Sequence, residues 1–157
     1  MIDTVHQELS TVDDTRAFGE RLARLLRAGD LVLLVGPLGA GKTALAQGIG
    51  AGLGVRGDVT SPTFVIARVH PPDPRRGGRF PLVHVDAYRL GGAVEVDDLD
   101  LDATTEESVT VVEWGQGIVE QLTDAHLEVR IDRRDDDTRV LTLVGHGGGW
   151  PERLGTL

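Results

Sequence analysis

The eight residues GPLGAGKT, at positions 36–43, constrain the fold of this chain more than any other stretch. They match the pattern G-x-x-x-x-G-K-[ST] at every specified position, and the apolar run LVLLV (31–35) comes directly before them. A short continuous apolar run indicates a strand buried on both faces, as in a parallel sheet covered by helices. Residues 42–54 are expected to form a helix that closes near Gly54. A strand, a glycine-rich turn and a helix in this order predict a phosphate-binding loop.

The residue types of this loop suit a nucleoside triphosphate. Glycines take positive φ without a Cβ clash, so that successive N–H groups converge on phosphate oxygens, and the helix start adds the positive end of its dipole. Lys42 is expected to reach the β- and γ-phosphates, and the Thr43 hydroxyl to take one coordination position of Mg²⁺. An ordinary turn whose lysine and threonine are accidental is the alternative, which the flanking strand and helix disfavour. The residues expected to bind the nucleotide here are Gly36, Pro37, Leu38, Gly39, Ala40, Gly41, Lys42 and Thr43.

Hydrophobic spacing predicts strands and helices along the rest of the chain. Residues 13–28 have apolar side chains at helical spacing, with Thr11 or Asp13 as N-cap and Gly29 just past the end. A short helix is expected near 116–122. This alternation predicts an α/β fold with a mostly parallel sheet and antiparallel edge strands. The further strands expected, the last two as a hairpin, are 63–70, 81–88, 109–114, 126–132 and 139–145.

Composition limits the classes of protein to which this chain can belong. Its 157 residues, 40% of them hydrophobic, fit one domain over residues 1–157. The net charge of −9 repels polyanions, so broad electrostatic binding of nucleic acid is not expected. The chain has no cysteine, no secretion signal and no apolar run near the roughly 20 residues that cross a bilayer, and we expect a cytoplasmic protein without membrane contact. Residues 71–79 and 146–157, rich in Pro and Gly, are expected to form a flexible loop and a loosely ordered tail.

Two acidic residues end predicted strands. Asp86 ends PLVHVD and Glu113 ends VTVVE. A Mg²⁺–nucleotide site needs a carboxylate at the carboxyl end of a neighbouring strand, and a buried carboxylate costs free energy unless it is paired or metal-bound. Each acid alone is equally well explained as the point where a strand emerges into water. Two of them beside a complete phosphate-binding loop favour a role in metal binding and catalysis, and the sequence leaves open which one touches Mg²⁺ directly.

Three further residues allow both a functional and a structural interpretation. Thr63, in the stretch SPTF, falls between the helix of the loop and the next strand, where its hydroxyl can reach metal or phosphate, although Ser-Pro also commonly opens a turn. Trp114 either flanks the site or belongs to the core. His84 lies two residues before Asp86 on the same strand face, and we interpret it as structural.

Five stretches follow one another along the chain: GPLGAGKT, SPTF, HVDAYRL (84–90), VDDLD (96–100) and VVEWGQ (111–116). Together they resemble the motifs of the TsaE (YjeE) family, small ATPases of bacterial tRNA threonylcarbamoyladenosine biosynthesis, over residues 8–145. The resemblance implies a P-loop NTPase-like three-layer sandwich that binds ATP and Mg²⁺. It also implies a weak ATPase that becomes productive on the TsaD–TsaB pair, which transfers threonylcarbamoyl to adenosine 37 of tRNAs that read ANN codons.

The resemblance also implies roles for individual residues. Lys42 and Thr43 are implied as the phosphate and Mg²⁺ residues. Glu113 is implied as a metal ligand, directly or through water, and Asp86 as an acid needed for hydrolysis. The catalytic residues expected are therefore Asp86, Lys42 and Glu113, and the metal ligands expected are Thr43, Glu113 and Asp86.

Other residues are implied beside the nucleotide. Thr63 resembles the switch threonine of the family, Trp114 is part of its motif, and Thr11 resembles an adenine contact. The chain departs from the family at Gln116, where an acid is common, and in its longer basic loop at 71–79. The departure at Gln116 removes support for a third carboxylate.

Two other functions remain open. A small-molecule kinase would use Arg75, Arg76 and Arg79 as a phosphate-clamping lid and Asp86 to activate an acceptor hydroxyl. A non-hydrolysing binding module would hold ATP without turnover. Only about 40 residues follow Glu113, too few for the acceptor domains that kinases usually attach, which favours the ATPase. We expect a monomer or weak dimer that contacts tRNA only through the TsaD–TsaB complex.

Overall fold

The computed structural model describes residues 4–36, 41–55, 67–86, 107–113, 125–136, 138–147 and 149–157. Within these residues one seven-stranded sheet has the order β1-β7-β6-β2-β5-β4-β3. The strands are β1 (Thr4–Leu9), β2 (Leu31–Val35), β3 (Ala67–His70), β4 (Leu82–Asp86), β5 (Val109–Glu113), β6 (His126–Arg133) and β7 (Arg139–His146). The helices are α1 (Val12–Ala23), α2 (Lys42–Leu53), α6 (Trp150–Leu154) and the 3₁₀ turn η1 (Pro74–Arg76).

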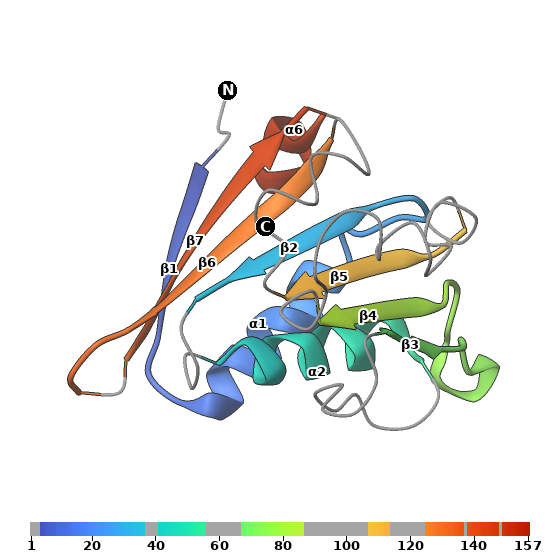
Figure 1. Cartoon of the computed structure of the whole chain (residues 1–157), viewed down its shortest axis with the longest axis horizontal. Helices are drawn as coiled ribbons and strands as arrows, with labels where there is room; N and C mark the ends of the chain where they lie inside the picture. Colours follow the sequence, from blue (N-terminus) through green and yellow to red (C-terminus); the bar gives the residue numbers. More distant parts are fainter. Residues whose placement is uncertain are drawn as a thin grey trace.

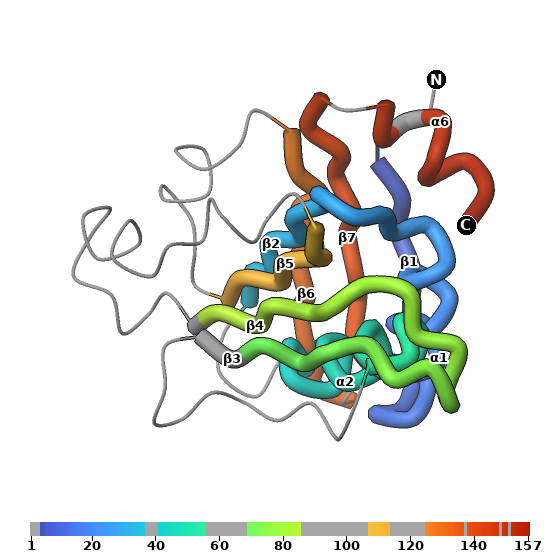
Figure 2. Tube along the Cα trace, turned by 90° about the vertical axis from the view of Figure 1, so that its right-hand side faces the viewer, coloured from blue at the N-terminus to red at the C-terminus, as the bar shows by residue number. Residues whose placement is uncertain are grey.

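The centre of the sheet is parallel and its two sides are antiparallel (Figure 1). The neighbours β4, β5, β2 and β6 run in the same direction. At one edge β3 pairs antiparallel with β4, and the two lie side by side in Figure 2. On the other side β7 lies antiparallel between β6 and β1. The predicted α/β fold with its mixed sheet is confirmed. The four parallel strands end together along one side, which we call the carboxyl edge of the sheet.

Most predicted strands lie close to their observed positions, and one strand was not predicted. The hairpin of β6 and β7 is confirmed, and the strand predicted at 81–88 begins at Leu82. Of the strand predicted at 63–70 the structure shows β3, while residues 61–66 and the helix predicted at 116–122 lie outside the described residues. β1 escaped prediction because an edge strand that is mostly exposed has no apolar run.

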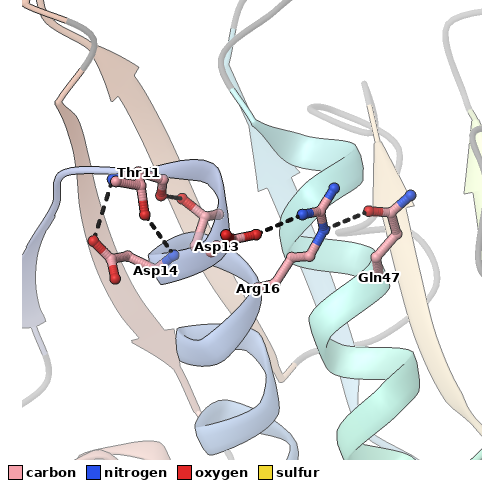
Figure 3. Close-up of polar contacts among 6 residues, drawn as sticks. Thr11, Asp13, Asp14, Arg16 and Gln47 are labelled. Atoms are coloured by element: carbon pink, nitrogen blue, oxygen red, sulfur yellow. Dashed lines mark hydrogen bonds and ion pairs between the residues drawn. The ribbon is translucent and has the colours of Figure 1, made fainter.

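Helix α1 begins at a capping box. The Thr11 hydroxyl accepts from the N–H of Asp14, and the Asp14 carboxylate accepts from the N–H of Thr11, as Figure 3 shows. Thr11, and not Asp13, is therefore the N-cap. The helix ends at Ala23, earlier than predicted, because the next amides form i to i−3 hydrogen bonds that tighten the last turn.

Helices α1 and α2 lie together against one face of the sheet (Figure 1). Glycines allow their backbones to approach closely: a Cβ on Gly48 would lie 2.1 Å from the carbonyl oxygen of Arg16. The same arginine joins the two helices at their surface, since its Nε donates to Gln47 (3.1 Å) while its Nη1 donates to Asp13 (3.0 Å), as Figure 3 shows. Glycines inside α2 therefore allow the two helices to pack closely.

No helix among the described residues is long and apolar enough to cross a bilayer.

Buried side chains point to both faces of the sheet. Val32 and Leu34 of β2 belong to the main apolar cluster, together with Phe18 of α1 and Ile49 of α2. Leu33, between them, is also buried, and it faces the opposite side because successive strand residues alternate. Burial on both faces explains the continuous apolar run LVLLV and suits the middle layer of a three-layer sandwich.

The C-terminal tail is more ordered than its glycine and proline content predicted. Trp150 of α6 is 2% exposed and belongs to the main apolar cluster. Gly145 of β7 makes room for it, since a Cβ there would lie 2.2 Å from the Cβ of Trp150. Arg153 lies over the Trp150 ring, pairs with Asp30 and donates to the carbonyl of Leu25. An aromatic anchor and a largely buried ion pair thus hold this segment on the core.

Candidate functional site

The end of β2 and the start of α2 position the two ends of the predicted phosphate-binding loop. Gly36 directly follows β2, and Gly41 is the N-cap of α2 with φ at 115°, where any side chain would be strained. Since glycine has no side chain to cap the helix, the first amides of α2 are left to other partners, including a ligand. The predicted binding residues at 37–40 lie outside the described residues.

The side chain of Lys42 connects the start of α2 with Gly36 at the end of β2. This side chain is largely buried, and the residue is 6% exposed, which is rare for lysine unless the ammonium group is paired. Its Nζ donates to the carbonyl oxygen of Gly36 at 2.6 Å. Thr43 follows as the second residue of α2 and is half-buried. Lys42, predicted to bind phosphate, and Thr43, predicted to bind the metal ion, are therefore adjacent at the start of α2.

Two strand ends bring acidic residues to the carboxyl edge. Glu113 is the last residue of β5 and is 5% exposed. In the sheet it is paired with Leu34 of β2 on one side and with Asp86 of β4 on the other. The structure thus makes the two predicted acids neighbours, and it places Glu113 beside the strand that leads into the phosphate-binding loop. The side chain of Asp86 is outside the described part of the structure.

His84 contacts Glu113 directly, which sequence reasoning missed. Its Nε2 lies 2.6 Å from Oε2 of Glu113, and the histidine is fully buried. His84 is paired with Val111 in the sheet, so that Glu113 is two residues further along the neighbouring strand on the same face. The sequence placed His84 on the same strand face as Asp86, but only the register of β4 with β5 brings it into contact with Glu113.

The start of α1 and the start of β7 lie beside Gly41. A Cβ on Gly41 would lie 3.8 Å from Cγ and Nε of Arg139 and 3.9 Å from Cγ2 of Thr15. Thr15 is buried, and its hydroxyl donates to the carbonyl of Thr11 at 3.3 Å. Thr11, the expected adenine contact, is therefore on this side of the loop, where its hydroxyl caps α1. Sequence reasoning did not identify Arg139, because only the pairing of β7 with β1, the strand that leads into α1, brings it here.

The donor types at the carboxyl edge fit Mg²⁺. Glu113 and Thr43 offer hard oxygen ligands of the kind that Mg²⁺ prefers. The described residues contain no group of three or more His, Asp or Glu side chains that could hold a metal ion. The expected residues Thr63 and Trp114 lie outside the described residues.

The arginine loop at 71–79 lies at the other end of α2. The Asp73 N–H donates to the carbonyl of Gly54 (2.8 Å), and Arg76 Nη1 donates to the carbonyl of Val55 (3.1 Å). Lys42 begins this 12-residue helix, whose length is about 18 Å. The loop therefore packs against the end of α2 that is remote from the phosphate-binding loop.

Comparisons with known proteins agree on one family. A family model described as threonylcarbamoyl adenosine biosynthesis protein TsaE matches residues 9–141. The chain is 61% identical over 140 residues to the tRNA threonylcarbamoyladenosine biosynthesis protein TsaE of Streptomyces coelicolor, covering 86% of this chain and 93% of that protein. The protein of the same name from Mycobacterium tuberculosis is 51% identical over 141 residues, covering 85% and 83%.

A solved structure has the same fold. The crystal structure of Bacillus subtilis YdiB matches with a TM-score of 0.79 at 29% identity, over 99% of this chain and 95% of that chain. It supports the P-loop NTPase-like fold that the sequence predicted.

Proposed function

The chain belongs to the TsaE family, and from this premise we propose that it is an ATP-binding, Mg²⁺-dependent ATPase that supports threonylcarbamoylation of adenosine 37 of tRNA. The observation that supports this most is the position of Lys42. Its ammonium group donates to the carbonyl of Gly36, directly after β2, and β2 is paired with β5, in which Glu113 is buried. A buried cation that follows β2 and a buried carboxylate on the strand paired with β2 suit a phosphate chain with its metal ion.

The chain's own residues would divide the chemistry between them. Lys42 and the first amides of α2 would bind phosphate oxygens, and Thr43 with Glu113 and Asp86 would hold Mg²⁺, directly or through water. When bound, Mg²⁺ neutralises negative charge on the β- and γ-phosphates. Asp86, paired with Glu113 in the sheet, would orient the attacking water. These roles require positioning and electrostatic stabilisation and no covalent step on the protein.

The proposed partners are the TsaD and TsaB proteins. Hydrolysis is weak in the isolated chain and stimulated by the pair, so that turnover is tied to tRNA modification. The kinase alternative has less support, because the loop with Arg75, Arg76 and Arg79 packs at the remote end of α2 and cannot cover the phosphates from there.

A Lys42→Ala variant tests the proposal. Removing a charge-assisted phosphate contact costs about 1.5–3 kcal/mol, so ATP affinity should fall by roughly 10- to 150-fold. Titration calorimetry with ATP and Mg²⁺ measures the affinity. Phosphate release and tRNA threonylcarbamoylation, with purified TsaD and TsaB added, measure the activity, and both should be lost.

The same assays separate the competing functions. Thermal unfolding checks that the variant is folded, and Arg24→Gln, at an exposed position beyond α1, controls for the loss of one positive charge. Unchanged ATP affinity and turnover in Lys42→Ala would contradict the proposal. Stoichiometric transfer of phosphate to a metabolite would identify a kinase instead, and tight ATP binding without turnover, even with both partners present, would identify a binding module.

A further inference from the structure

One buried polar contact joins two neighbouring parallel strands at the carboxyl edge. His84 of β4 and Glu113 of β5 meet with Nε2 and Oε2 2.6 Å apart, and their side chains are 0% and 6% exposed. With the ring proton on Nε2, this nitrogen donates and the carboxylate oxygen of Glu113 accepts. The contact therefore restrains the carboxylate of Glu113 from one side.

Stability alone explains this pair poorly. Taking a carboxylate and an imidazole out of water costs free energy, and apolar residues of similar volume are often at least as stabilising. On the face that His84 and Glu113 share, the preceding strand residues Leu82, Val109 and Val111 are buried and apolar, so the polar pair lies next to apolar core side chains. The Nδ1 atom of His84 is buried without a hydrogen-bond partner among the described residues, which adds to the cost.

We infer that His84 is a positioning residue for Glu113, an inference that rests on the proposed function. Side chains that ligate metal ions are commonly held by a further hydrogen bond, which fixes their orientation before the metal binds. His84 provides that bond from the strand next to Glu113 and two residues before Asp86. Its role is to orient the carboxylate, and it does not itself contact nucleotide or metal.

Two amide variants of His84 test whether this side chain orients the carboxylate of Glu113 or only fills buried space. The Nε2 atom of glutamine reaches about as far along the side chain as Nε2 of histidine, whereas the amide nitrogen of asparagine reaches only as far as Nδ1. His84→Gln therefore keeps a donor near Glu113, and His84→Asn keeps a polar amide but withdraws the donor. The probe is Mn²⁺ in the presence of a non-hydrolysable ATP analogue, with bound Mn²⁺ measured by electron paramagnetic resonance.

We expect His84→Asn to weaken Mn²⁺ binding by about 10- to 100-fold and His84→Gln to remain within about 3-fold of wild type. The affinity for the analogue without metal should be unchanged in both. His126→Asn replaces a buried histidine at the start of β6, the end remote from the carboxyl edge of the sheet. We expect this control variant to leave Mn²⁺ affinity unchanged. Thermal unfolding of each variant reports the structural cost separately.

The outcomes distinguish the inference from the function on which it rests. If wild type does not bind Mn²⁺ with the analogue, or Glu113→Gln binds it equally well, the metal role of Glu113 and the inference both fail. If wild type binds in a Glu113-dependent way and His84→Asn binds equally tightly, only the inference fails. Should His84→Asn not fold, ¹⁵N shifts of the wild-type His84 ring decide: a proton on Nε2 supports the inference, and a proton on Nδ1 overturns it.

Discussion

Arg139 adds a positive charge beside the loop that the sequence motif does not contain. Its Cγ and Nε approach the Cβ position of Gly41 to 3.8 Å. A guanidinium group this near a bound triphosphate contributes favourable electrostatic free energy in a partly buried site. We expect Arg139→Gln to weaken ATP binding by about tenfold, or about 1.4 kcal/mol, as measured by titration calorimetry. If the affinity changes no more than in the Arg24→Gln control, the side chain of Arg139 does not act on the nucleotide.

At the scale of single residues, the sequence predicts what local pattern determines. The loop glycines, Lys42 and Thr43 follow from one spacing rule, and Glu113 follows from its place at the end of an apolar run. The contact of His84 depends on the register of β4 with β5, and the proximity of Arg139 depends on the pairing of β7 with β1, strands that are far apart in sequence. Because no local rule gives that register, these two residues could be found only in the structure.

At the scale of elements, the contact between α1 and α2 requires glycine. We expect Gly48→Ala to lower the free energy of unfolding by about 1–3 kcal/mol, because the new Cβ would lie 2.1 Å from the backbone oxygen of Arg16 and neither helix yields easily. Chemical denaturation measures this loss, and Ala51→Ser, at an exposed position of the same helix, should stay within about 0.5 kcal/mol. A Gly48→Ala protein as stable as wild type would mean that the helices separate at little cost.

Elements were predicted where their own residues determine them. β2 and β5 are apolar runs, and α2 begins after a recognisable loop. β1 is ordered by pairing with β7 along its whole length, and α6 is ordered by the insertion of Trp150 over Gly145. Both are fixed by tertiary partners, and neither has a local hydrophobic pattern strong enough to predict it.

At the scale of the whole molecule, the net negative charge of the chain disfavours direct binding of the tRNA whose modification it is proposed to support. The net charge is −9, and the arginine loop lies at the end of α2 remote from the phosphate-binding loop. Since nonspecific binding depends on neutralising phosphates with a basic surface, we expect the isolated chain to bind unmodified tRNA more weakly than about 10⁻⁴ M at about 0.15 M salt. Mobility-shift titration with and without TsaD and TsaB measures this, and retention should require the partners.

The arginine loop provides the control, because its clustered positive charges are the feature most able to bind tRNA directly and so to contradict the expected weak binding. Arg75, Arg76 and Arg79 are all exposed on one short segment. Tight binding of tRNA by the isolated chain that disappears when all three are replaced by alanine would show direct contact through this loop. If the triple variant still modifies tRNA normally with its partners, these arginines are not needed for contact with tRNA. The acidic surface then favours docking on proteins over binding of RNA, since it repels the phosphate backbone.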